Sequence, residues 1–349
     1  MESFDPSVLL SFLDSVGLSD DPRRQVGDIG VLLLVGARGC AQLGGVPEPA
    51  PSPVAVPECV AVAYRRGEGR SVEPGAARVG SWATSWSDAE HAAAVAAVRE
   101  AIGRGEVYQG NVVGHRSAPY RGDPVALAAA VASLPGARYA GVLAGDGWAV
   151  GSASPEQLVR VEGSRVTTVP IKGTDKDPTR LRGSAKDRAE HVMIVDLERN
   201  DLARVTDAGS VVVEDLYTVS EWADLWHASS TIAGRLADGV GTADVLRALL
   251  PGGSVTGAPK HAACGLLSEL EPVGRGPAMG AFGFLWPGGM DLGLTIRTVA
   301  AADGQVHLWA GGGITWGSDP GLEVAEAHAK AAPVVSALSR LTRDSCGWA

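Results

Sequence analysis

The alternation of hydrophobic and polar positions divides the chain into predicted strands and helices. The apolar run VLLLVG (31–36) predicts a buried strand, and EVYQGNVVGH (106–115) predicts a second one. Residues 141–174 are typical of successive strands that are separated by Asp-Gly and Gly-Ser turns. Residues 290–314 predict a hairpin with an Asp-Gly turn.

Two further stretches have the spacing of apolar residues that helices show. Residues 87–104 predict an amphipathic helix with Ser87 or Asp88 as its N-cap. Residues 321–341 predict a second helix, in which Pro333 must introduce a kink or mark the start.

A third helix is predicted over residues 184–205, where Ser184 and Asp187 resemble a capping box with Asp in place of the usual Glu or Gln. Strand-rich segments, antiparallel hairpins and several helices together indicate an α+β protein rather than a doubly wound parallel sheet. The loosely patterned residues 1–85 are expected to be a variable N-terminal portion that packs on a catalytic core of residues 86–345.

Composition and charge narrow the class of protein. The 349 residues are 45% hydrophobic and 20% charged, as in folded globular proteins, and no internal repeat is found. The formal net charge of −10 argues against a nucleic-acid-binding protein, which would carry a basic face, but leaves open a small anionic substrate. The four cysteines are scattered, without zinc-like spacing or the density of a disulfide framework.

The sequence gives no sign of a membrane or secretory segment. No apolar run approaches the roughly 20 residues of a membrane-spanning helix. The N-terminus is acidic and lacks the basic-then-apolar order of a signal peptide. A cytoplasmic location without membrane contact is therefore expected.

Lys172 is the first candidate for chemistry. It stands in TVPIKGTDKD (168–177), at the end of a β-branched stretch, and the chain has only five lysines among its 30 basic residues. A buried lysine can lose its proton and act as a nucleophile, which arginine cannot do. From position alone, a solvated lysine at a strand end is the more ordinary explanation of the residue.

Carboxylates and glycines form the next candidates. Glu323, Glu326 and Lys330 share one helix face, and Glu190 lies early in another helix. Convergent carboxylates could hold Mg²⁺, although such a stripe is usually a solvated face. The glycine-rich stretches PGGSVTGAPK (251–260) and AGGGI (310–314) could present backbone N–H groups to an anion, or be ordinary turns.

Taken together, the motifs resemble those of the chorismate-utilising enzymes, which include anthranilate synthase component I, aminodeoxychorismate synthase component I, and the isochorismate and salicylate synthases. The matching stretches follow the family's order over roughly residues 87–335. They are EVYQGN, SPEQL, PIKGT, KDRAEHVMIVDLERNDLARV, PGGSVTGAPK, LTIRT, GGGI and SDPGLEVAEAHAK. The resemblance implies the fold of anthranilate synthase component I, in which antiparallel sheets pack as a sandwich with helices outside.

Within this family, PIKGT resembles the aminodeoxychorismate synthases, whereas anthranilate synthases carry PIAGT. The resemblance therefore implies that Lys172 is a covalent nucleophile that adds to C2 of chorismate while the 4-hydroxyl leaves. Ammonia then attacks C4 and expels the lysine, which yields 4-amino-4-deoxychorismate. Such a lysine needs a lowered pKa, which an apolar strand end and a nearby Mg²⁺ would both favour.

The resemblance also implies roles for carboxylates and for one amide. Glu156 matches the general acid for the departing hydroxyl, and Gln109 stands where the water-using relatives have a lysine base. Glu190 and Glu326 match the Mg²⁺ ligands, with Glu323 and Asp187 nearby.

The substrate contacts implied by the resemblance come from seven further positions. Lys330 and the amides of Gly312 and Gly313 would hold the ring carboxylate. Arg297 would hold the enolpyruvyl carboxylate, because a buried arginine needs an anionic partner. His227 matches a histidine beside the ring, and the pocket would also be lined by Thr174 and Thr256.

Three departures or absences qualify the resemblance. Ala278 stands where many members have an aromatic residue that helps bind the enolpyruvyl carboxylate. No LLES-type motif of a tryptophan-sensing site is found, so feedback inhibition by tryptophan is not expected. No G-x-C-x-G glutaminase elbow is present, so the ammonia should be free in vitro or come from a separate glutamine amidotransferase subunit.

Three alternatives stay open. Anthranilate synthase component I would convert the same chorismate to anthranilate and pyruvate. A pyridoxal-phosphate enzyme would use Lys172 for a Schiff base, and the carboxylate-rich motif argues against it. A non-catalytic chorismate-binding relative would have lost the chemistry, and Ala278 keeps this alternative open. The sequence does not decide whether the product serves 4-aminobenzoate and folate synthesis or a specialised pathway.

Overall fold

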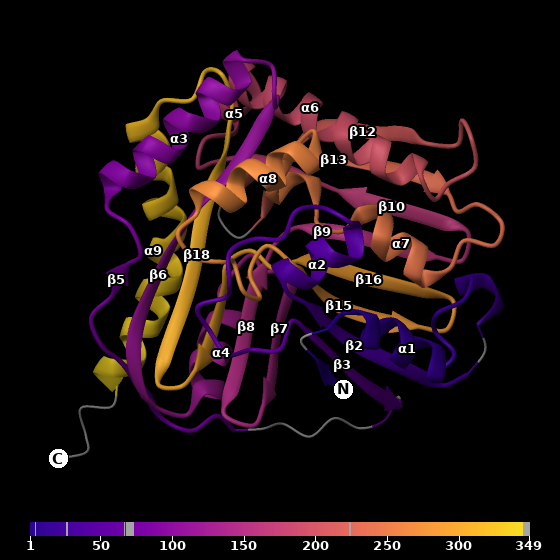
Figure 1. The fold of residues 1–349 in the computed structure, drawn as a ribbon, viewed down its shortest axis with the longest axis horizontal. Helices are drawn as coiled ribbons and strands as arrows, with labels where there is room; N and C mark the ends of the chain where they lie inside the picture. Colours follow the sequence, from indigo (N-terminus) through magenta and orange to yellow (C-terminus); the bar gives the residue numbers. More distant parts are fainter. Residues whose placement is uncertain (4, 26, 66, 68–72, 223–224, 345–349) are drawn as a thin grey trace.

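The computed structural model describes residues 1–344 apart from 4, 26, 66, 68–72 and 223–224. In this part of the chain every strand pairing within the sheets is antiparallel, and the strands form two large sheets that lie side by side in Figure 1. The α+β prediction is thereby confirmed.

The larger sheet carries Lys172. It has ten strands in the order β1-β3-β2-β15-β16-β9-β10-β13-β11, and β12 pairs with β13. The strands in that order are β1 (Glu2–Ser3), β3 (Cys59–Arg65), β2 (Ile29–Val35), β15 (Ala281–Trp286), β16 (Gly289–Leu294), β9 (Gln157–Glu162), β10 (Arg165–Val169), β13 (Leu225–Arg235), β11 (Ile171–Asp175) and β12 (Val212–Trp222).

The two longest strands of the second sheet, β6 and β18, are neighbours and run along the left of Figure 1. This sheet has eight strands in the order β14-β6-β18-β17-β8-β7, and two short strands add to β6. The strands are β14 (Gly257–Ala258), β6 (Gln109–Gly122), β18 (Gln305–Ile314), β17 (Thr298–Ala302), β8 (Trp148–Ser154), β7 (Tyr139–Gly145), β4 (Ala77–Val79) and β5 (Ala83–Thr84).

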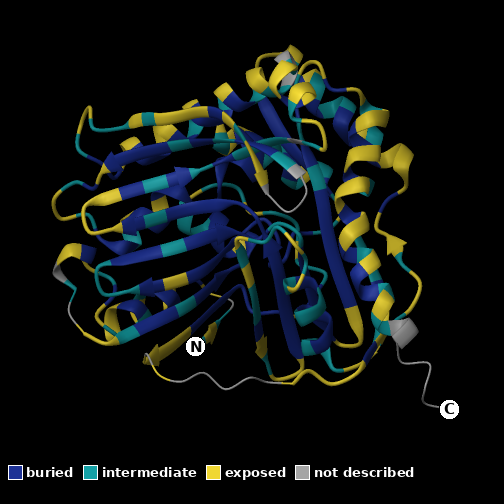
Figure 2. Ribbon diagram, turned by 180° about the vertical axis from the view of Figure 1, so that it is seen from behind, coloured by how far each residue is buried: buried dark blue, intermediate teal, exposed yellow. Residues whose placement is uncertain are grey.

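Helices cover the two sheets, and their outward faces are among the exposed parts of the molecule in Figure 2. Their bounds are α1 (Ser7–Ser15), α2 (Ala37–Gly44), α3 (Asp88–Gly103), α4 (Pro124–Ala132), α5 (Pro178–Gly183), α6 (Ala185–Ala203), α7 (Thr242–Leu249), α8 (Lys260–Leu270) and α9 (Pro320–Asp344), with 3₁₀ turns η1 (Pro22–Arg24) and η2 (Gly253–Val255).

The main hydrophobic core joins the two sheets. It contains Leu33 of β2 and Leu292 of β16 from the larger sheet, and Val150 of β8 and Trp309 of β18 from the smaller one. A second core lies between the other face of the smaller sheet and helices α4 and α9. Burying apolar surface on both faces fixes β18 firmly, and the candidate site lies at its C-terminal end.

The predicted helices are confirmed, and so are two of the caps. Ser87 caps α3 in a complete capping box with Glu90. The hydroxyl of Ser184 accepts a hydrogen bond from the backbone N–H of Asp187 at 3.1 Å at the start of α6. Pro333 lies inside α9, so it does not mark the start of that helix.

The prediction of one hairpin over residues 290–314 is wrong in its first part. Asp303 and Gly304 do form the turn between β17 and β18, but β16 pairs with β15 and β9 in the other sheet. The chain leaves one sheet for the other at Arg297, whose φ is +50°. The apolar pattern continues across this crossover, so it gave no signal of the break.

The N-terminal residues join the larger sheet directly. Strand β2 pairs with β15 from Ala281↔Val35 to Leu285↔Val31, and β1 pairs with β3. The predicted strand at 31–36 is confirmed as part of β2. No helix among the described residues is long and apolar enough to cross a membrane.

Candidate active site

The end of the β6–β18 pair gathers several of the predicted site residues. Gly313 of β18 pairs with Asn111 of β6, and Ile314 pairs with Gly110. A methyl group on Gly313 would collide with the Gln109 side-chain amide and lie 3.0 Å from Nζ of Lys172. Glycine at this position therefore allows two polar side chains from distant parts of the sequence to meet over the strand.

Lys172 reaches this point from the larger sheet. It lies in β11, which pairs with β13 through Ile171↔Ser229 and Thr174↔His227. Burial lowers the pKa of the Lys172 ammonium, and the positive charge of Lys330 lowers it further, against the opposing attraction of nearby carboxylates. The predicted nucleophile needs a lowered pKa, and the surroundings of Lys172 shift its pKa in that direction.

Gln109 is fully buried, and both polar atoms of its side chain lack a hydrogen-bond partner among the described residues. Leaving a buried amide unpaired costs about 1–3 kcal/mol for each group. Such an arrangement is expected where a bound molecule completes the hydrogen bonds. The amide lies over Gly313, beside the Lys172 amine, so it faces the place where a substrate would bind.

Glu156 lies in the connection between β8 and β9 and is buried. Burial raises the pKa of its carboxyl group, while hydrogen bonds and the charge of Lys172 oppose that increase. One of those hydrogen bonds comes from the Ser254 hydroxyl, which donates to Oε1 at 2.7 Å. A raised pKa favours the protonated form of the carboxyl group, which is the form that a general acid requires.

The carboxylates of α9 approach β18 at the neighbouring glycine. A methyl group on Gly312 would lie 3.2 Å from Oε2 of Glu323 and 3.7 Å from both Oε1 of Glu326 and Nζ of Lys330. Lys330 forms an ion pair with Glu326 at 2.7 Å and donates to the carbonyl of Gly311 at 2.9 Å. The glycine run thus lets charged groups of α9 come close to the strand backbone.

The oxygen donors here fit the chemistry of a Mg²⁺ site. Glu190 of α6 accepts a 3.5 Å contact from the Thr315 hydroxyl, which places its carboxylate just beyond the end of β18, and the charges of Glu190 and Glu326 both act on Lys172. Within the described residues, no three acidic, histidine or cysteine side chains form a ready metal cluster. Mg²⁺ commonly needs only one or two carboxylates together with waters and substrate oxygens.

Arg297 and His227 both lie in the described part of the chain, and their predicted roles stay predictions. The guanidinium of Arg297 has no ion pair in the described part of the chain, and burial lowers its pKa. An anionic ligand would relieve this unfavourable burial. His227 is buried on β13. Its partner on the neighbouring strand is Thr174, which follows Lys172 by two residues.

The two predicted threonines differ in what can be said of them. The side chain of Thr174 lies outside the part of the chain that the structure describes, although its backbone is in β11. The Thr256 hydroxyl is buried and donates to the Gly252 carbonyl at 2.8 Å. The backbone N–H groups of Val255 and Thr256 bond within their own turn, so these two groups are not available to an anion.

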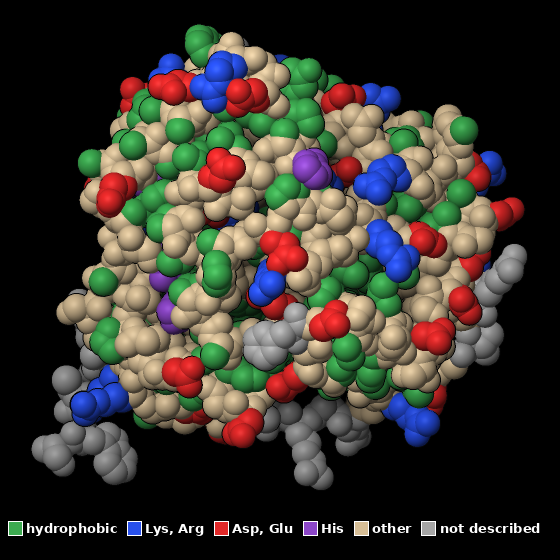
Figure 3. Space-filling view, in the orientation of Figure 1, with side chains coloured by type: hydrophobic (Ala, Val, Ile, Leu, Met, Phe, Trp, Pro, Cys, Tyr) green, Lys and Arg blue, Asp and Glu red, His purple; other side chains and the backbone are tan. Residues whose placement is uncertain are grey.

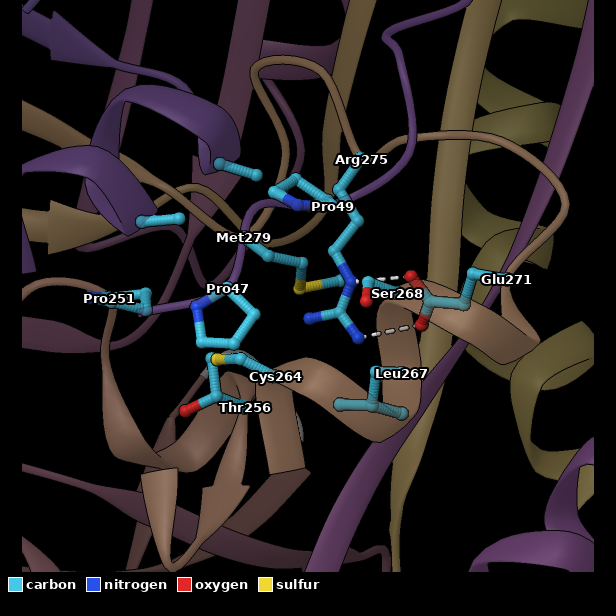
Figure 4. A pocket seen from close by; sticks show the side chains of 12 residues that line it. Pro47, Pro49, Pro251, Thr256, Cys264, Leu267, Ser268, Glu271, Arg275 and Met279 are labelled. Carbon is cyan, nitrogen blue, oxygen red and sulfur yellow. Dashed lines mark hydrogen bonds and ion pairs between the residues drawn. The ribbon is translucent and has the colours of Figure 1, made fainter. Parts of the chain in front are cut away.

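A separate, small pocket lies beside Thr256 (Figure 4). Apolar side chains form most of its wall, and the buried ion pair of Arg275 with Glu271, at 2.6 Å, lies at one side. Thr256 is the only predicted site residue in its lining. Because its walls are mainly apolar and its one arginine is already paired, this pocket is a poor place for a dicarboxylate substrate.

Sequence reasoning missed two buried polar residues next to the predicted ones. Ser254 contacts Glu156 across a separation of 98 residues. His191 is fully buried, pairs through Nε2 with the Ser230 hydroxyl at 2.6 Å, and has its pKa lowered to about 4 by burial and by the charge of Lys172. Both residues lie in stretches that were singled out, PGGSVTGAPK and KDRAEHVMIVD, but nothing in a single sequence distinguished them from their neighbours.

Comparison with known protein families matches residues 55–336 to the chorismate-binding enzymes. The chain is 40% identical to anthranilate synthase component 1 of Streptomyces coelicolor over 74% of this chain and 53% of that protein. It is 36% identical to aminodeoxychorismate synthase component 1 of Escherichia coli over 74% of this chain and 60% of that protein. The chain thus spans between half and three fifths of the length of these relatives.

Among solved structures, the fold is similar to that of anthranilate synthase component I from Streptococcus pneumoniae. The TM-score is 0.81 at 24% sequence identity, and the match covers 93% of this chain and 85% of the other. The similarity confirms the predicted fold. The relatives carry two different enzyme names, so the comparisons do not distinguish between the two reactions.

Proposed function

The chain belongs to the family of chorismate-binding enzymes, and on that premise we propose that it is component I of an aminodeoxychorismate synthase. The observation that carries the proposal is the position of Lys172. Its amine lies against Gly313 and beside the Gln109 amide, in surroundings that lower its pKa. A lysine at this point can serve as a nucleophile.

In the proposed reaction, the neutral amine of Lys172 forms a bond to C2 of chorismate. The two conjugated ring double bonds shift, and the 4-hydroxyl group leaves as water after it takes a proton from Glu156. Ammonia then bonds to C4, both double bonds shift back, and the bond between C2 and the lysine nitrogen breaks. Glu156 recovers a proton from the incoming nitrogen, so chorismate and ammonia give aminodeoxychorismate and water.

The remaining site residues bind and orient the substrate in this proposal. Arg297 holds one carboxylate of chorismate, while Lys330 and the backbone at Gly312 and Gly313 hold the other. Gln109 supplies amide hydrogen bonds to the substrate and, unlike a lysine, does not activate water as a competing nucleophile. When bound by Glu190 and Glu326, with Glu323 close by, Mg²⁺ would neutralise substrate charge.

Ammonia is proposed to come from a separate amidotransferase subunit. The relatives are named as component 1 of their synthases, and the chain contains no G-x-C-x-G elbow. Purified chain should therefore use ammonium salts and show no activity with glutamine alone. Glutamine-dependent activity of the isolated chain would contradict this part of the proposal.

Anthranilate synthase component I is the second candidate, because relatives of this name are as similar as the others. Mass spectrometry of the products formed from chorismate, Mg²⁺ and ammonium at mildly alkaline pH separates the two reactions. Aminodeoxychorismate, which keeps the enolpyruvyl group, would support the proposal. Anthranilate together with pyruvate would overturn it in favour of the second candidate.

A further inference from the structure

Ser254 contacts the proposed general acid from a buried position. Its hydroxyl donates to Oε1 of Glu156 at 2.7 Å, and both residues are at most 5% exposed. Hydrogen bonds to a charged carboxylate are about twice as strong as those between neutral groups. Since no solvent competes at this depth, the hydroxyl restricts how the Glu156 carboxyl group can rotate.

The turn that carries Ser254 is held on three sides. The Thr256 hydroxyl bonds to Gly252 at 2.8 Å, and a guanidinium nitrogen of Arg275 donates to the carbonyl of Val255 at 2.6 Å. On the third side the turn lies directly on α6, because a methyl group on Gly253 would be 2.5 Å from Leu197 and 3.3 Å from Oε1 of Glu198. Ser254 is therefore presented to Glu156 by a rigid support.

Besides Arg275 and its ion-pair partner Glu271, which follow α8 in the chain, the charged groups around this turn come from three helices and one strand. Lys172 of β11 and Lys330 of α9 act on Glu156 from the side of the proposed substrate site. Behind the turn, Asp201 of α6 pairs with Lys260 of α8 at 2.7 Å. Glu198, hydrogen-bonded by Thr168 at 3.1 Å, has its pKa raised to about 8 by burial and by the neighbouring Asp201. At neutral pH, Glu198 is thus mainly uncharged and adds little negative charge near Glu156.

We propose that Ser254 is a positioning residue that fixes Oε1 of Glu156 and so directs the other carboxyl oxygen, with its proton, at the departing hydroxyl of the substrate. This inference rests on the proposed role of Glu156 as general acid. The hydrogen bond has a second consequence, because it stabilises the ionised carboxylate and opposes the effect of burial on the Glu156 pKa. The acid then remains able to release its proton and to accept one again.

The first test compares Ser254→Ala with the wild type in assays of chorismate consumption with Mg²⁺ and ammonium. We expect kcat to fall roughly tenfold or more with KM little changed, since Ser254 would act on the acid and not on substrate binding. The limb of the pH profile on which activity is lost by deprotonation should move to higher pH, and Ser254→Thr, which keeps the hydroxyl, should restore the wild-type limb.

Ser268→Ala is the matched control, because the Ser268 hydroxyl bonds only to the carbonyl of Gly265 in its own helix, at 2.7 Å. It should leave kcat and the pH profile unchanged. An equal loss in both alanine variants would point to general destabilisation, and an unchanged Ser254→Ala profile would overturn the inference.

A measurement without turnover separates this inference from the proposed function. Infrared difference spectra of the wild type against Glu156→Gln, recorded over a range of pH, report protonation of the Glu156 carboxyl group. The same pair in the Ser254→Ala background should titrate at higher pH. If it does while the enzyme makes no aminodeoxychorismate, the contact is right and the proposed function fails. If the titration does not move, the inference fails whatever the product.

Discussion

Two clusters of polar residues lie along the β6–β18 strand pair, and they differ in how far their hydrogen bonds are satisfied. At the site end of the pair, the buried Gln109 amide has no hydrogen-bond partner among the described residues, and Lys172 brings an amine against Gly313. Farther along the same strands, the ring of His115 is bonded on both sides, to the Ser85 hydroxyl at 2.5 Å and to His307 at 3.0 Å.

The difference separates a binding site from a structural cluster. The two histidine rings are buried, stack on each other and are bonded within the protein, and His307 also stacks on Trp309, so the pair has little to gain from a ligand. The Gln109 amide lacks a hydrogen-bond partner among the described residues and lies close to the Lys172 amine, because glycine at position 313 lets both groups approach the strand. Both groups of residues are buried, so burial does not distinguish them. A buried amide without a hydrogen-bond partner, next to an amine, points to a function.

The largest expected effect comes from removing the amine at the site end. Lys172→Met keeps a side chain of similar length and should reduce formation of aminodeoxychorismate by roughly a thousandfold or more, because the nucleophile is lost. Stability should not fall, since the substitution removes a buried group whose charged form is disfavoured. Product assays and thermal unfolding check the two parts.

Lys176→Met is the control for this variant, since Lys176 is exposed and only four residues away. It should retain wild-type turnover. Retention of turnover by Lys172→Met as well would rule out the covalent role of Lys172.

A smaller effect is expected from adding a methyl group to β18 at Gly313. Gly313→Ala should lower kcat/KM about a hundredfold, because the new methyl group collides with the Gln109 amide and comes within 3.0 Å of the Lys172 amine. Gly317→Ala is the matched control, because a methyl group there has no atom within 4 Å. Steady-state kinetics of both variants with varied chorismate measure the effect. Equal activities would show that turnover does not depend on the positions of the Gln109 amide and the Lys172 amine over Gly313.

The smallest expected effect on activity, and the clearest effect on stability, comes from the histidine pair. Burial lowers the pKa of His115 to about 3 and that of His307 to about 4, from a usual value of 6.5. The unfolded chain therefore takes up protons first as the pH falls below 6.5, and the folded state loses about 2 kcal/mol per histidine by pH 5.

His307→Gln removes one of these titrations and should reduce the loss of unfolding free energy between pH 7 and pH 5 by about 2 kcal/mol. Denaturant unfolding at the two pH values measures it, with the exposed His261→Gln as a control. Turnover at mildly alkaline pH should stay unchanged. A substantial loss of turnover in His307→Gln would show that the two groups of residues are not functionally separate.

Local sequence patterns were sufficient to predict α3, α6 and α9 and several of the strands, whereas α1, α2, α4, α5 and α7 were not predicted. Ser87 and Glu90 form a cap from residues three apart, so the sequence contained the whole signal for the start of α3. The crossover at Arg297 was missed, because its left-handed backbone conformation is imposed by two sheets that the chain joins there. A continuous apolar run has no feature that marks such a change of sheet.

The same distinction applies to the site. Motif order identified the family and led to Lys172, Glu156 and Glu190, which lie in short characteristic stretches. The contact of Ser254 with Glu156 and the closeness of Gln109 to Lys172 arise from strands and turns that are distant in the sequence. Such contacts depend on tertiary packing, so no local spacing could have predicted them.

The central claim, that Lys172 becomes covalently attached to the substrate, can be tested by intact-protein mass spectrometry. The protein is mixed with chorismate and Mg²⁺ in the absence of ammonium, and the mass is measured before and after ammonium is added. The account predicts an adduct equal to chorismate less one water, located on the peptide that contains Lys172 and released by ammonium as aminodeoxychorismate. Product formation at full rate without any adduct, in the wild type and in Lys172→Met alike, would contradict it.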